Sequence, residues 1–561
     1  MSALVLMLLT AAPLPAPKAP RDVDPVMDVM AAELKRAMTL SMPATAESKQ
    51  PEKPYYARCY VTVEDEFGVS ANFGALYPPG GGRSLSIETT VRVGSEKFDN
   101  TNFSGGGYGY SFGGRGRFPA EEDLDAIRRS LWLSFDGNYK AAVEAIARKR
   151  AFLQANQVKD VIADWSTVTP EVVLLPREEP PALDADAWAA RVKKASAACR
   201  ASKSAHSCTV GFRSRHMCQR FVASDGAKHR FCETKLELKV SASGQAADGM
   251  PVGAEWKVQG RSEAELPDEA ALLAAVKDTA AMLEKKLAAP AADQDYVGPV
   301  LFTESAAPIF FLATLASPLS FPRENLGQRQ QGRLTERLGK HVSVSALSAI
   351  DDPTQRAWTS PTGAVVPLFG HYPVDDDGVT PKPVTLVKEG VLQSFFMSRI
   401  PTKAFATSNG HARGSQASTG SLFVSTSQPQ PLAALKKRLV ELAKEEDSDF
   451  GLMVSVLPQN LNDRPNGSTV TLPNLPLLVH RVYADGREEL VRGYGFKPTS
   501  QRVLKDIVGM GDDPRAINTE QFGQNVSAVA PSVLVKLLEL NRARDDYGKP
   551  PALPRPALSV K

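Results

Sequence analysis

Residues 85–93 read Leu85-Ser-Ile-Glu-Thr-Thr-Val-Arg-Val93, a stretch in which an apolar or β-branched residue occupies every second position. Serine, glutamate, threonine and arginine fill the positions between them. Side chains of a β-strand point alternately to its two faces, so this period of two predicts a strand with one buried and one solvated face. We therefore expect a sheet here that is covered on one side.

Helical periodicity surrounds this strand. Apolar residues recur every three or four positions in residues 26–41, in 124–135 and again in 139–146. The pair Asp136-Gly137 lies between the last two stretches, and we expect it to separate two helices. Residues 267–287 have the pattern of a further amphipathic helix.

Residues 288–295 (AAPAADQD) predict a domain boundary, and the sequence after them is richer in strand-like runs. Glu389-Gly390 and Asp485-Gly486 are hairpin turn signals between strand-like runs. Strands and helices alternate irregularly here, which predicts an α+β protein rather than a doubly wound sheet. The expected strands are 384–387, 391–396, 476–483, 488–491 and 526–540, and the expected helices are 433–446 and 500–508.

The composition is that of a globular protein. The chain has 561 residues, of which 43% are hydrophobic and 23% charged, and a formal net charge of +3. This near balance of charge gives no footprint for nucleic acid. Beyond the N-terminus no apolar run approaches the length of a membrane-spanning helix, so we expect no membrane span in the mature chain.

The first sixteen residues carry no charged side chain and include an apolar run at residues 3–12. The run has the length of a signal-peptide core, although no lysine or arginine precedes it. We expect a signal peptide at residues 1–16 and a periplasmic or secreted protein; the alternative is a cytosolic start. Residues 104–117 are rich in glycine and aromatic residues and are read as a surface loop, with a lid over a site as the alternative.

Four of the five cysteines lie within a short meander, and they are Cys199, Cys208, Cys218 and Cys232. A three-residue loop at Ser224-Asp-Gly226 would place Cys218 opposite Cys232 in a hairpin. We expect that pair and Cys199–Cys208 to form disulfides, which an oxidising compartment permits. The alternatives are buried thiols, or a mixed zinc site that also uses the interleaved His206, His216 and His229.

No catalytic constellation emerges from the other polar residues. The chain has neither a His-Glu-x-x-His nor a Gly-x-Ser-x-Gly motif. His371 precedes the run Asp375-Asp376-Asp377, and His411 follows it. Three consecutive aspartates do not fit a calcium loop, so a polar turn is expected, with a metal site as the alternative.

Several segments, in order along the chain, nevertheless resemble the TldD/PmbA family, peptidase-like proteins once called modulators of DNA gyrase. The resemblance runs from about Tyr55 to the C-terminus. Its segments are 83–94 (RSLSIETTVRVG), 98–101 (FDNT), 221–226 (FVASDG), 298–302 (GPVLF), 376–379 (DDGV), 387–392 (VKEGVL), 485–492 (DGREELVR) and 529–535 (VAPSVLV).

The resemblance implies a two-domain α+β fold, with an N-terminal α/β domain that has a mixed sheet and a β-rich C-terminal domain. It also implies a homodimer or a heterodimer with a zinc-bearing family member, and binding of extended peptides by strand addition. The expected organisation is a signal peptide at 1–16, a helix and linker at 17–54, the N-terminal domain at 55–290, the C-terminal domain at 296–545 and a proline-rich tail at 546–561.

Active family members bind zinc through His-Glu-x-x-x-His and a later cysteine. Here Phe311, Leu312 and Ala316 stand where the first histidine, the glutamate and the second histidine belong. Residues 303–340 contain no histidine, and no cysteine follows Cys232. Hydrocarbon side chains offer zinc no lone pair, so we expect no family zinc, no other cofactor and no catalytic residue of the family type.

The leading hypothesis is an exported, metallopeptidase-like protein that binds extended peptides or supports a catalytic partner in proteolysis. One alternative is an active metallopeptidase with a relocated site, using His371, His411 and Asp375, Asp376 and Asp377. Another is a structural protein of the cell envelope.

Overall fold

The structure is a computed structural model that describes most of the chain. The signal peptide expected at 1–16, the glycine-rich loop at 104–117 and most of the tail at 546–561 lie outside the described residues. The described residues are 24–42, 52–103, 120–158, 162–327, 333–414, 416–459, 461, 468–474, 478–543, 547–549 and 551.

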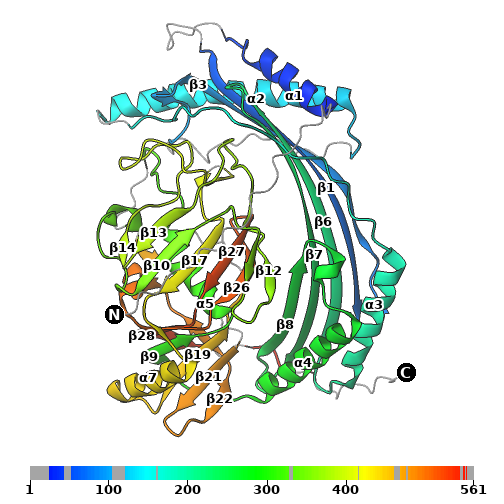
Figure 1. Ribbon diagram of the computed structural model, residues 1–561, viewed down its shortest axis with the longest axis vertical. Helices are drawn as coiled ribbons and strands as arrows, with labels where there is room; N and C mark the ends of the chain where they lie inside the picture. Colours follow the sequence, from blue (N-terminus) through cyan, green and yellow to red (C-terminus); the bar gives the residue numbers. More distant parts are fainter. Residues whose placement is uncertain are drawn as a thin grey trace.

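The N-terminal half is built on one long, curved sheet that arches over the rest of the molecule (Figure 1). Its strands run in the order β4-β3-β1-β6-β7-β5, with β2 paired to β1 and β8 to β7. All neighbours are antiparallel except β5 and β7. The bounds are β1 Pro54–Asn72, β2 Ala75–Leu76, β3 Gly80–Ser95, β4 Phe98–Asp99, β5 Val172–Leu174, β6 Ser207–Ala223, β7 Lys228–Gln245 and β8 Pro251–Gly260.

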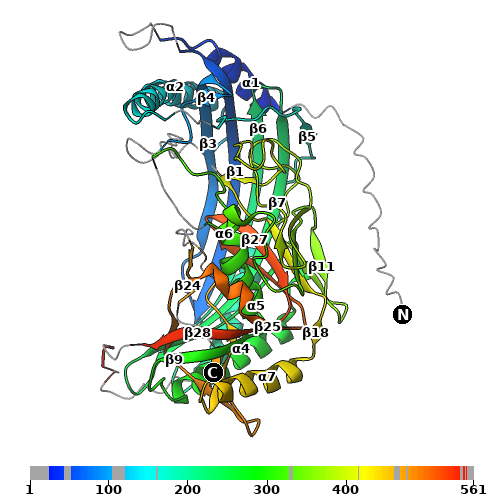
Figure 2. The same ribbon diagram turned by 90° about the vertical axis from the view of Figure 1, so that its left-hand side faces the viewer.

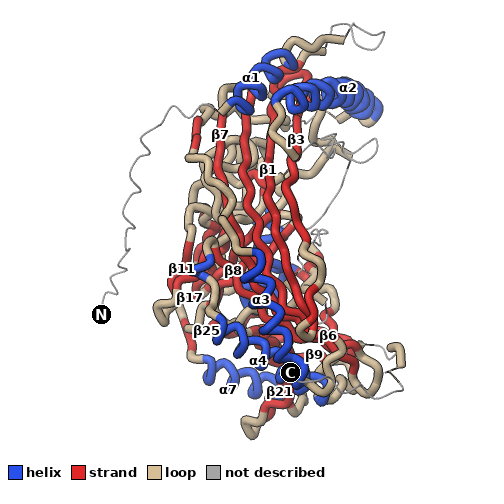
Figure 3. Tube along the Cα trace, turned by 90° about the vertical axis from the view of Figure 1, so that its right-hand side faces the viewer, coloured by secondary structure: helices blue, strands red, loops and turns tan. Residues whose placement is uncertain are grey.

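Four helices cover the convex face of this sheet at its two ends (Figure 3). Each begins at an aspartate whose carboxylate accepts a hydrogen bond from a backbone N–H of the first turn, which satisfies an otherwise unpaired donor. The helices α1 and α2 pack at one end of the sheet, and α3 and α4 at the other. Their bounds are α1 Pro25–Ala37, α2 Leu124–Ala155, α3 Ala185–Ala197 and α4 Glu269–Ala288.

The alternation of residues along β3 fits this arrangement. Leu85, Ile87 and Val91 are buried against α1 and α2, whereas Ser84, Ser86 and Glu88 are exposed. The opposite, concave face of the sheet looks towards the C-terminal half. Lys235 of β7 reaches Asn525 there, at 3.1 Å between Nζ and Oδ1.

The C-terminal half contains two larger sheets on the concave side of the arch (Figure 2). One runs β14-β13-β10-β17-β27-β26 and the other β18-β25-β28-β9-β19-β21-β22, with β23 paired to β28. The strands are β9 Tyr296–Phe302, β10 Leu347–Asp351, β11 Ala357–Thr359, β12 Val365–Pro367, β13 Val384–Lys388, β14 Val391–Leu392, β15 Ala412–Arg413, β16 Gln416–Ala417, β17 Ser421–Thr426, β18 Pro429–Gln430, β19 Phe450–Val456, β20 Thr469–Val470, β21 Leu478–Tyr483, β22 Glu488–Val491, β23 Tyr494–Phe496, β24 Thr499–Ser500, β25 Ile507–Gly511, β26 Arg515–Gln521, β27 Gln524–Ala530 and β28 Val533–Arg542.

A short helical segment lies between these two sheets and forms the centre of the largest core. It consists of α5 (Ala306–Phe311), a π-helical turn (Leu312–Ala316) and α6 (Ser317–Leu319). The helix α7 (Leu432–Glu445) packs with β9 and β19 in a smaller core of its own. Short 3₁₀ turns lie at Ala198–Ala201, Glu263–Glu265, Leu334–Arg337 and Gln501–Lys505.

The α+β class is confirmed, but four local expectations are wrong. The strand expected at 391–396 extends only over Val391–Leu392. The helix α2 is continuous through Asp136 and Gly137. Residues 500–508 form a 3₁₀ turn followed by β25, and not a helix. Residues 526–540 form two strands, because Pro531 lacks an N–H for the ladder and the chain passes there from one sheet to the other. No helix in the described part of the chain is long and apolar enough to cross a membrane.

Candidate functional site

In the helical segment at 306–319, the three positions aligned with the family motif carry hydrocarbon side chains. Phe311, Leu312 and Ala316 each have 0% of their surface exposed. Phe311 packs edge-on against Phe310, which in turn stacks on Phe302 of β9. The segment therefore contributes to stability as a core element.

The backbone of this segment nevertheless departs from a regular α-helix at the same place. Leu312–Ala316 form a π-helical turn, which bonds residue i to residue i+5. Such a turn brings positions five apart, here Phe311 and Ala316, towards the same side of the helix. The two histidines of a His-Glu-x-x-x-His motif are also five positions apart, and here Phe311 and Ala316 occupy that spacing.

The residues present do not fit zinc. Thr314 is fully buried, and its hydroxyl donates to the carbonyl oxygen of Phe310 at 2.7 Å. Zinc sites in proteins are made of thiolate, imidazole and carboxylate ligands, none of which this segment supplies. Within the described residues, His, Cys, Asp and Glu side chains come close enough to share a metal only at His216, Cys218 and Cys232, in the long sheet.

Asp375, Asp376 and Asp377 form a turn whose carboxylates are held by backbone amides. Asp375 Oδ1 accepts hydrogen bonds from the N–H groups of Asp377 and Val379, and its Oδ2 accepts one from Ala412. Burial, followed by the neighbouring Asp377, raises the pKa of Asp375 well above its ordinary value, against the pull of these donors. Burial also raises the pKa of Asp376.

This turn is the point where the two halves of the chain meet. Arg58 of β1 forms an ion pair with Asp377 and also donates to the carbonyl oxygen of Asp376. Tyr60, two residues further along β1, donates to the same carbonyl oxygen. The three aspartates therefore act as a polar turn that docks onto the concave face.

The two histidines proposed alongside these aspartates are engaged elsewhere. His371 Nδ1 lies 2.8 Å from the carbonyl oxygen of Pro353, and burial lowers the pKa of this histidine to about 4. His411 is fully buried, with Nε2 3.2 Å from Asp351 Oδ1. The structure brings Asp375 into contact with the backbone beside His411, through the N–H of Ala412, but it does not assemble the five residues into one metal-ligand group.

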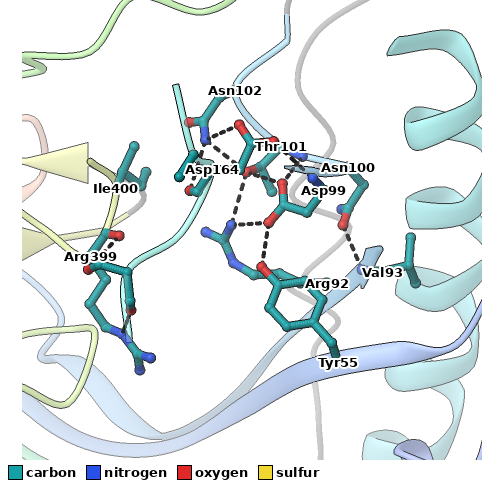
Figure 4. Close-up of polar contacts among 12 residues, drawn as sticks. Tyr55, Arg92, Val93, Asp99, Asn100, Thr101, Asn102, Asp164, Arg399 and Ile400 are labelled. Carbon is teal, nitrogen blue, oxygen red and sulfur yellow. Dashed lines mark hydrogen bonds and ion pairs between the residues drawn. The ribbon is translucent and has the colours of Figure 1, made fainter. Parts of the chain in front are cut away.

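A second buried network, which the sequence patterns did not identify, lies beside this contact (Figure 4). Arg92 of β3 pairs with Asp99 at 2.6 Å, and Tyr55 donates to the same carboxylate at 2.7 Å. Asp164 accepts from the backbone N–H of Asp99 and pairs with Lys149 and Arg323. Asp99 belongs to the segment 98–101, which carries part of the family resemblance. That segment is the one feature of the sequence that points to this network.

Trp165 connects the two networks. The guanidinium carbon of Arg92 lies 3.6 Å from the centre of the Trp165 ring, and that of Arg399 lies 4.6 Å from it. Arg399 also pairs with Asp225 at 2.6 Å, and its backbone N–H donates to Asp377. These contacts hold β1, β3 and the loop after β14 in one rigid arrangement.

Away from this junction, the concave face is hollowed into a groove of about 480 Å³ across β3, β1, β6 and β7. We call it the concave groove. Its charged side chains are of both signs, and Arg213 pairs with Glu66 at 2.6 Å. The lining residues are Glu66, Phe67, Gly68, Val69, Ser70, Pro78, Gly80, Gly81, Gly211, Phe212, Arg213, Glu237 and Lys239.

Glycines form much of the floor of the concave groove. A Cβ added to Gly68 would meet only two carbonyl oxygens at 3.9 Å, one added to Gly80 would meet nothing within 4 Å, and one added to Gly211 would make ordinary contacts from 3.6 Å. None of these three glycines has a positive φ. Their backbones therefore do not require glycine, and what the missing side chains leave is open space above the sheet.

Gly81 differs from these three. Its φ is 115°, and a Cβ there would lie 2.3 Å from the carbonyl oxygen of Glu66. The backbone conformation and the close neighbouring strand therefore require glycine at this position.

The outer edge of β3 borders the concave groove. Among the described residues, β3 pairs with a strand on that side only through Gly94 and Ser95, which face β4. An edge strand with unpaired main-chain groups is a template for an added strand.

The structure joins Cys199 to Cys208 and Cys218 to Cys232, which is compatible with the expected pairing. Cys218 lies directly opposite Cys232 in the register of β6 and β7, and Cys59 is a buried free thiol. Of the three interleaved histidines, only His216 approaches these sulfurs, whereas His206 is exposed and His229 stacks on Phe221.

Comparison with known proteins places residues 295–542 in the family model described as the PmbA/TldA metallopeptidase C-terminal domain. A metalloprotease from Archaeoglobus fulgidus is 36% identical over 80 residues, which are 14% of this chain and 16% of that relative. The chain thus matches only a small part of the length of this relative.

Three solved structures share the fold over most of the chain. A candidate modulator of a DNA gyrase from Thermotoga maritima has a TM-score of 0.58 and 16% identity, covering 86% of this chain and 96% of its own. One from Bacteroides thetaiotaomicron has a TM-score of 0.59 and 12% identity, covering 92% and 98%. TldE from Thermococcus kodakarensis has a TM-score of 0.55 and 12% identity, covering 92% and 100%.

Proposed function

The chain belongs to the TldD/PmbA family of metallopeptidase-like proteins, and from this premise we propose that it is a member without its own family-type zinc, which binds extended polypeptide. In this role it presents peptide, or supports a zinc-bearing relative as the non-catalytic subunit of a heterodimer. A homodimer of this chain would bind peptide without hydrolysing it.

The observation that carries the proposal is the hydrocarbon at Phe311, Leu312 and Ala316. These side chains are fully buried in a packed core, so no donor atom points from these positions towards a metal. Replacement of both histidines and the glutamate of the His-Glu-x-x-x-His motif removes two zinc ligands and the general base that hydrolysis by zinc-bound water requires.

Peptide binding is supported by the concave groove and by the edge of β3. An extended peptide needs main-chain partners, which the edge offers, and room for side chains of any kind, which a glycine floor provides. The groove carries charges of both signs, at Glu66, Arg213, Glu237 and Lys239, and a charged peptide side chain would compete with their partners in the protein, such as Glu66 for Arg213 and Glu255 for Lys239. These features favour broad recognition over a single sequence.

Metal analysis and peptide binding test the proposal together. Protein purified without reductant should contain no stoichiometric zinc by mass spectrometry of the elements, and a fluorescent, carboxymethylated casein peptide should bind it by anisotropy. Gly68→Val and Gly211→Val, which fill the concave groove, should weaken that binding at least tenfold.

Gly253→Val is the matched control. Gly253 is a strand glycine with an ordinary φ and room for a Cβ, and it lies outside the groove. Its substitution should leave the peptide affinity unchanged. One tightly held zinc ion per chain in the oxidised protein, or equal peptide affinity in the groove variants and the wild type, contradicts the proposal.

Export and partnership complete the proposal. Two disulfides suit a periplasmic or secreted protein, and expression with and without residues 1–16 should show whether the mature chain is recovered outside the cytoplasm. A zinc-bearing relative mixed with this chain should form a complex in size-exclusion chromatography and gain peptidase activity.

Hydrolysis of casein by the lone chain that is abolished by His371→Ala would instead establish a relocated active site. Failure to bind any peptide, or any family member, would favour the structural role in the cell envelope.

A further inference from the structure

We propose that His216, Cys218 and Cys232 form a redox-gated site for a zinc-class divalent cation on the convex face of the long sheet. The disulfide Cys218–Cys232 closes the site, and its reduction opens it. The site is independent of the positions discussed above at Phe311, Leu312 and Ala316, which lie in the other half of the chain.

Strand geometry puts the three ligands together. His216 and Cys218 are two residues apart on β6, so their side chains share a face of the sheet, and Cys232 lies directly opposite Cys218 on β7. The possible ligand atoms, one imidazole nitrogen and the two sulfurs, all lie within 4.8 Å of one another. Two thiolates and one imidazole are three of the four ligands that a tetrahedral zinc site takes, which leaves one position for water.

The hydroxyl of Thr234 can hydrogen-bond to either tautomer of His216. His216 Nδ1 lies 2.8 Å from the hydroxyl of Thr234, and its Nε2 lies 3.4 Å from Cys218 Sγ and 3.1 Å from the carbonyl oxygen of Glu178. A hydroxyl both donates and accepts, so Thr234 can accept from Nδ1–H while Nε2 offers its lone pair to a cation. Such a second contact is what orients a metal-binding imidazole.

Two arginines and a backbone donor lie near the sulfurs. The next cross-strand pair on the same face is Arg220 and Arg230, which share the carboxylate of Asp24 at 2.8 and 3.2 Å, and Arg220 also pairs with Glu122 at 3.3 Å, so carboxylates balance their charge. The backbone N–H of Glu178 also donates to Cys232 Sγ at 3.4 Å. A donated N–H of this kind stabilises thiolate, the form that binds metal.

A cation can approach the site from outside the molecule. The helices of the convex face cover its two ends and leave the middle of the long strands without a helix (Figure 3). Cys218 and Cys232 lie one cross-strand pair from Arg220 and Arg230, which contact Asp24 at the start of α1. Cys218 is buried and Cys232 is half-buried, so a cation would enter from the side of Cys232. The backbone of the exposed Glu178 lies over the three residues: its N–H contacts Cys232 and its carbonyl oxygen contacts His216.

The opening step needs a named reductant, and a dithiol supplies it. The dithiol transfers two electrons to the Cys218–Cys232 bond and becomes a cyclic disulfide, and its two protons end on the two released sulfurs. The divalent cation then displaces these two protons and binds both thiolates and the imidazole. A disulfide oxidant reverses the step: it takes the two electrons and, with two protons from water, becomes a dithiol, while the Cys218–Cys232 bond re-forms and the cation is released.

Cobalt uptake tests the site. The whole protein is reduced with a phosphine, which takes its oxygen from water and leaves the two hydrogens on the sulfurs, and Co²⁺ is then added. One equivalent should bind, with a thiolate-to-cobalt charge-transfer absorbance, and zinc should displace it. The same protein without reduction should bind none.

Variants and thiol mapping locate the cobalt. Cys218→Ser/Cys232→Ser should abolish the absorbance, His216→Ala should weaken binding about tenfold or more, and Cys199→Ser/Cys208→Ser should bind as the wild type does. In the wild type, zinc should protect Cys218 and Cys232, but not Cys199 and Cys208, from iodoacetamide, as read by peptide mass spectrometry.

Three results of the binding experiments overturn the proposal. They are reduced, folded protein that binds no cobalt, equal binding by Cys218→Ser/Cys232→Ser, and equal zinc protection of all four cysteines. Circular dichroism follows folding throughout, and unfolding of the Cys199→Ser/Cys208→Ser variant on reduction also overturns the proposal, because the site requires β6 and β7 to stay paired.

Discussion

Arg58 and Asp377 form a buried ion pair between strand β1 and the turn at residues 375–379, with Arg58 Nη1 2.5 Å from Asp377 Oδ1. Their side chains are 9% and 6% exposed. The two residues are 319 positions apart in sequence, and this pair joins the long sheet to the C-terminal half. Gly378, in the same turn, lies so close to Phe221 and Ala227 that an added Cβ would meet both at 3.1 Å. The Arg58–Asp377 pair is therefore shielded from solvent.

Removal of one partner of this pair should therefore be costly. Arg58→Met leaves a buried carboxylate without its cation, and we expect it to lower the free energy of unfolding by about 3–5 kcal/mol. Asp377→Asn should cost a similar amount, and a double-mutant cycle in urea should give a coupling of about 0.5–3 kcal/mol.

The exposed pair Lys140–Asp136 on α2 provides the control, with side chains 58% and 35% exposed at 2.6 Å. Lys140→Met should cost only about 0.3–0.5 kcal/mol because solvent screens such a pair. Equal effects of the buried and exposed substitutions would show that Arg58 and Asp377 do not join the two halves.

His229 should make stability fall in acid. Burial, helped by the charge of Arg58, lowers the pKa of His229 to about 3, from an ordinary value of 6.5. Between these two values the unfolded chain binds the proton and the folded chain does not, so stability is lost as the pH falls from 6.5 towards 3, by up to about 1.4 kcal/mol per pH unit for this group.

His229→Phe removes that titration and keeps the stacking of the ring on Phe221, whose centroid is 4.5 Å away. The advantage of this variant over the wild type should grow as urea unfolding is measured at pH 7, 6, 5 and 4. His206→Gln, a change at an exposed histidine, should follow the wild type at every pH. Parallel curves for His229→Phe and wild type would refute the assignment.

Asp164 should tolerate substitution less than Lys149, although both side chains are fully buried and only 2.5 Å apart. Asp164 also pairs with Arg323 at 2.9 Å, so Asp164→Asn leaves two cations short of a carboxylate. Lys149→Met leaves Asp164 with Arg323. We expect a loss of about 3–5 kcal/mol for Asp164→Asn and a smaller one for Lys149→Met, measured by urea unfolding. The reverse order would contradict the assignment of both cations to Asp164.

Local patterns in the sequence predicted local structure well. The alternation at residues 85–93 and the turn at Ser224-Asp-Gly226 fix which residues face each other, so the register of Cys218 against Cys232 could be inferred. The helix break predicted at Asp136-Gly137 is wrong because contacts with the sheet stabilise the middle of α2. Asn138 donates to the backbone and hydroxyl oxygens of Thr89 on β3, and such packing outweighs the roughly 1 kcal/mol that glycine costs in a helix.

The polar junction could not be predicted in the same way. Arg58, Asp164 and Asp377 carry no periodic or spaced signal, because their partners come from distant parts of the chain and meet only after folding. The run at Asp375 was noticed for its charge, but its carboxylates are satisfied by backbone amides that a sequence does not display. The concave groove was missed because strand glycines read as turn or bulge signals, whereas here they leave space over a sheet.

Phe311 provides the sharpest test of the segment between the two C-terminal sheets. If this segment is a core element, Phe311→Ala should lower the free energy of unfolding by about 3–5 kcal/mol, the range for a large buried ring replaced by methyl. Leu133→Ala, at a half-exposed position of α2, should change it by no more than about 0.5 kcal/mol. Neither variant should alter the metal content of the oxidised protein. A Phe311→Ala variant as stable as the wild type would mean that the ring is not part of a packed core, and the proposal of a member without family-type zinc would lose its main support.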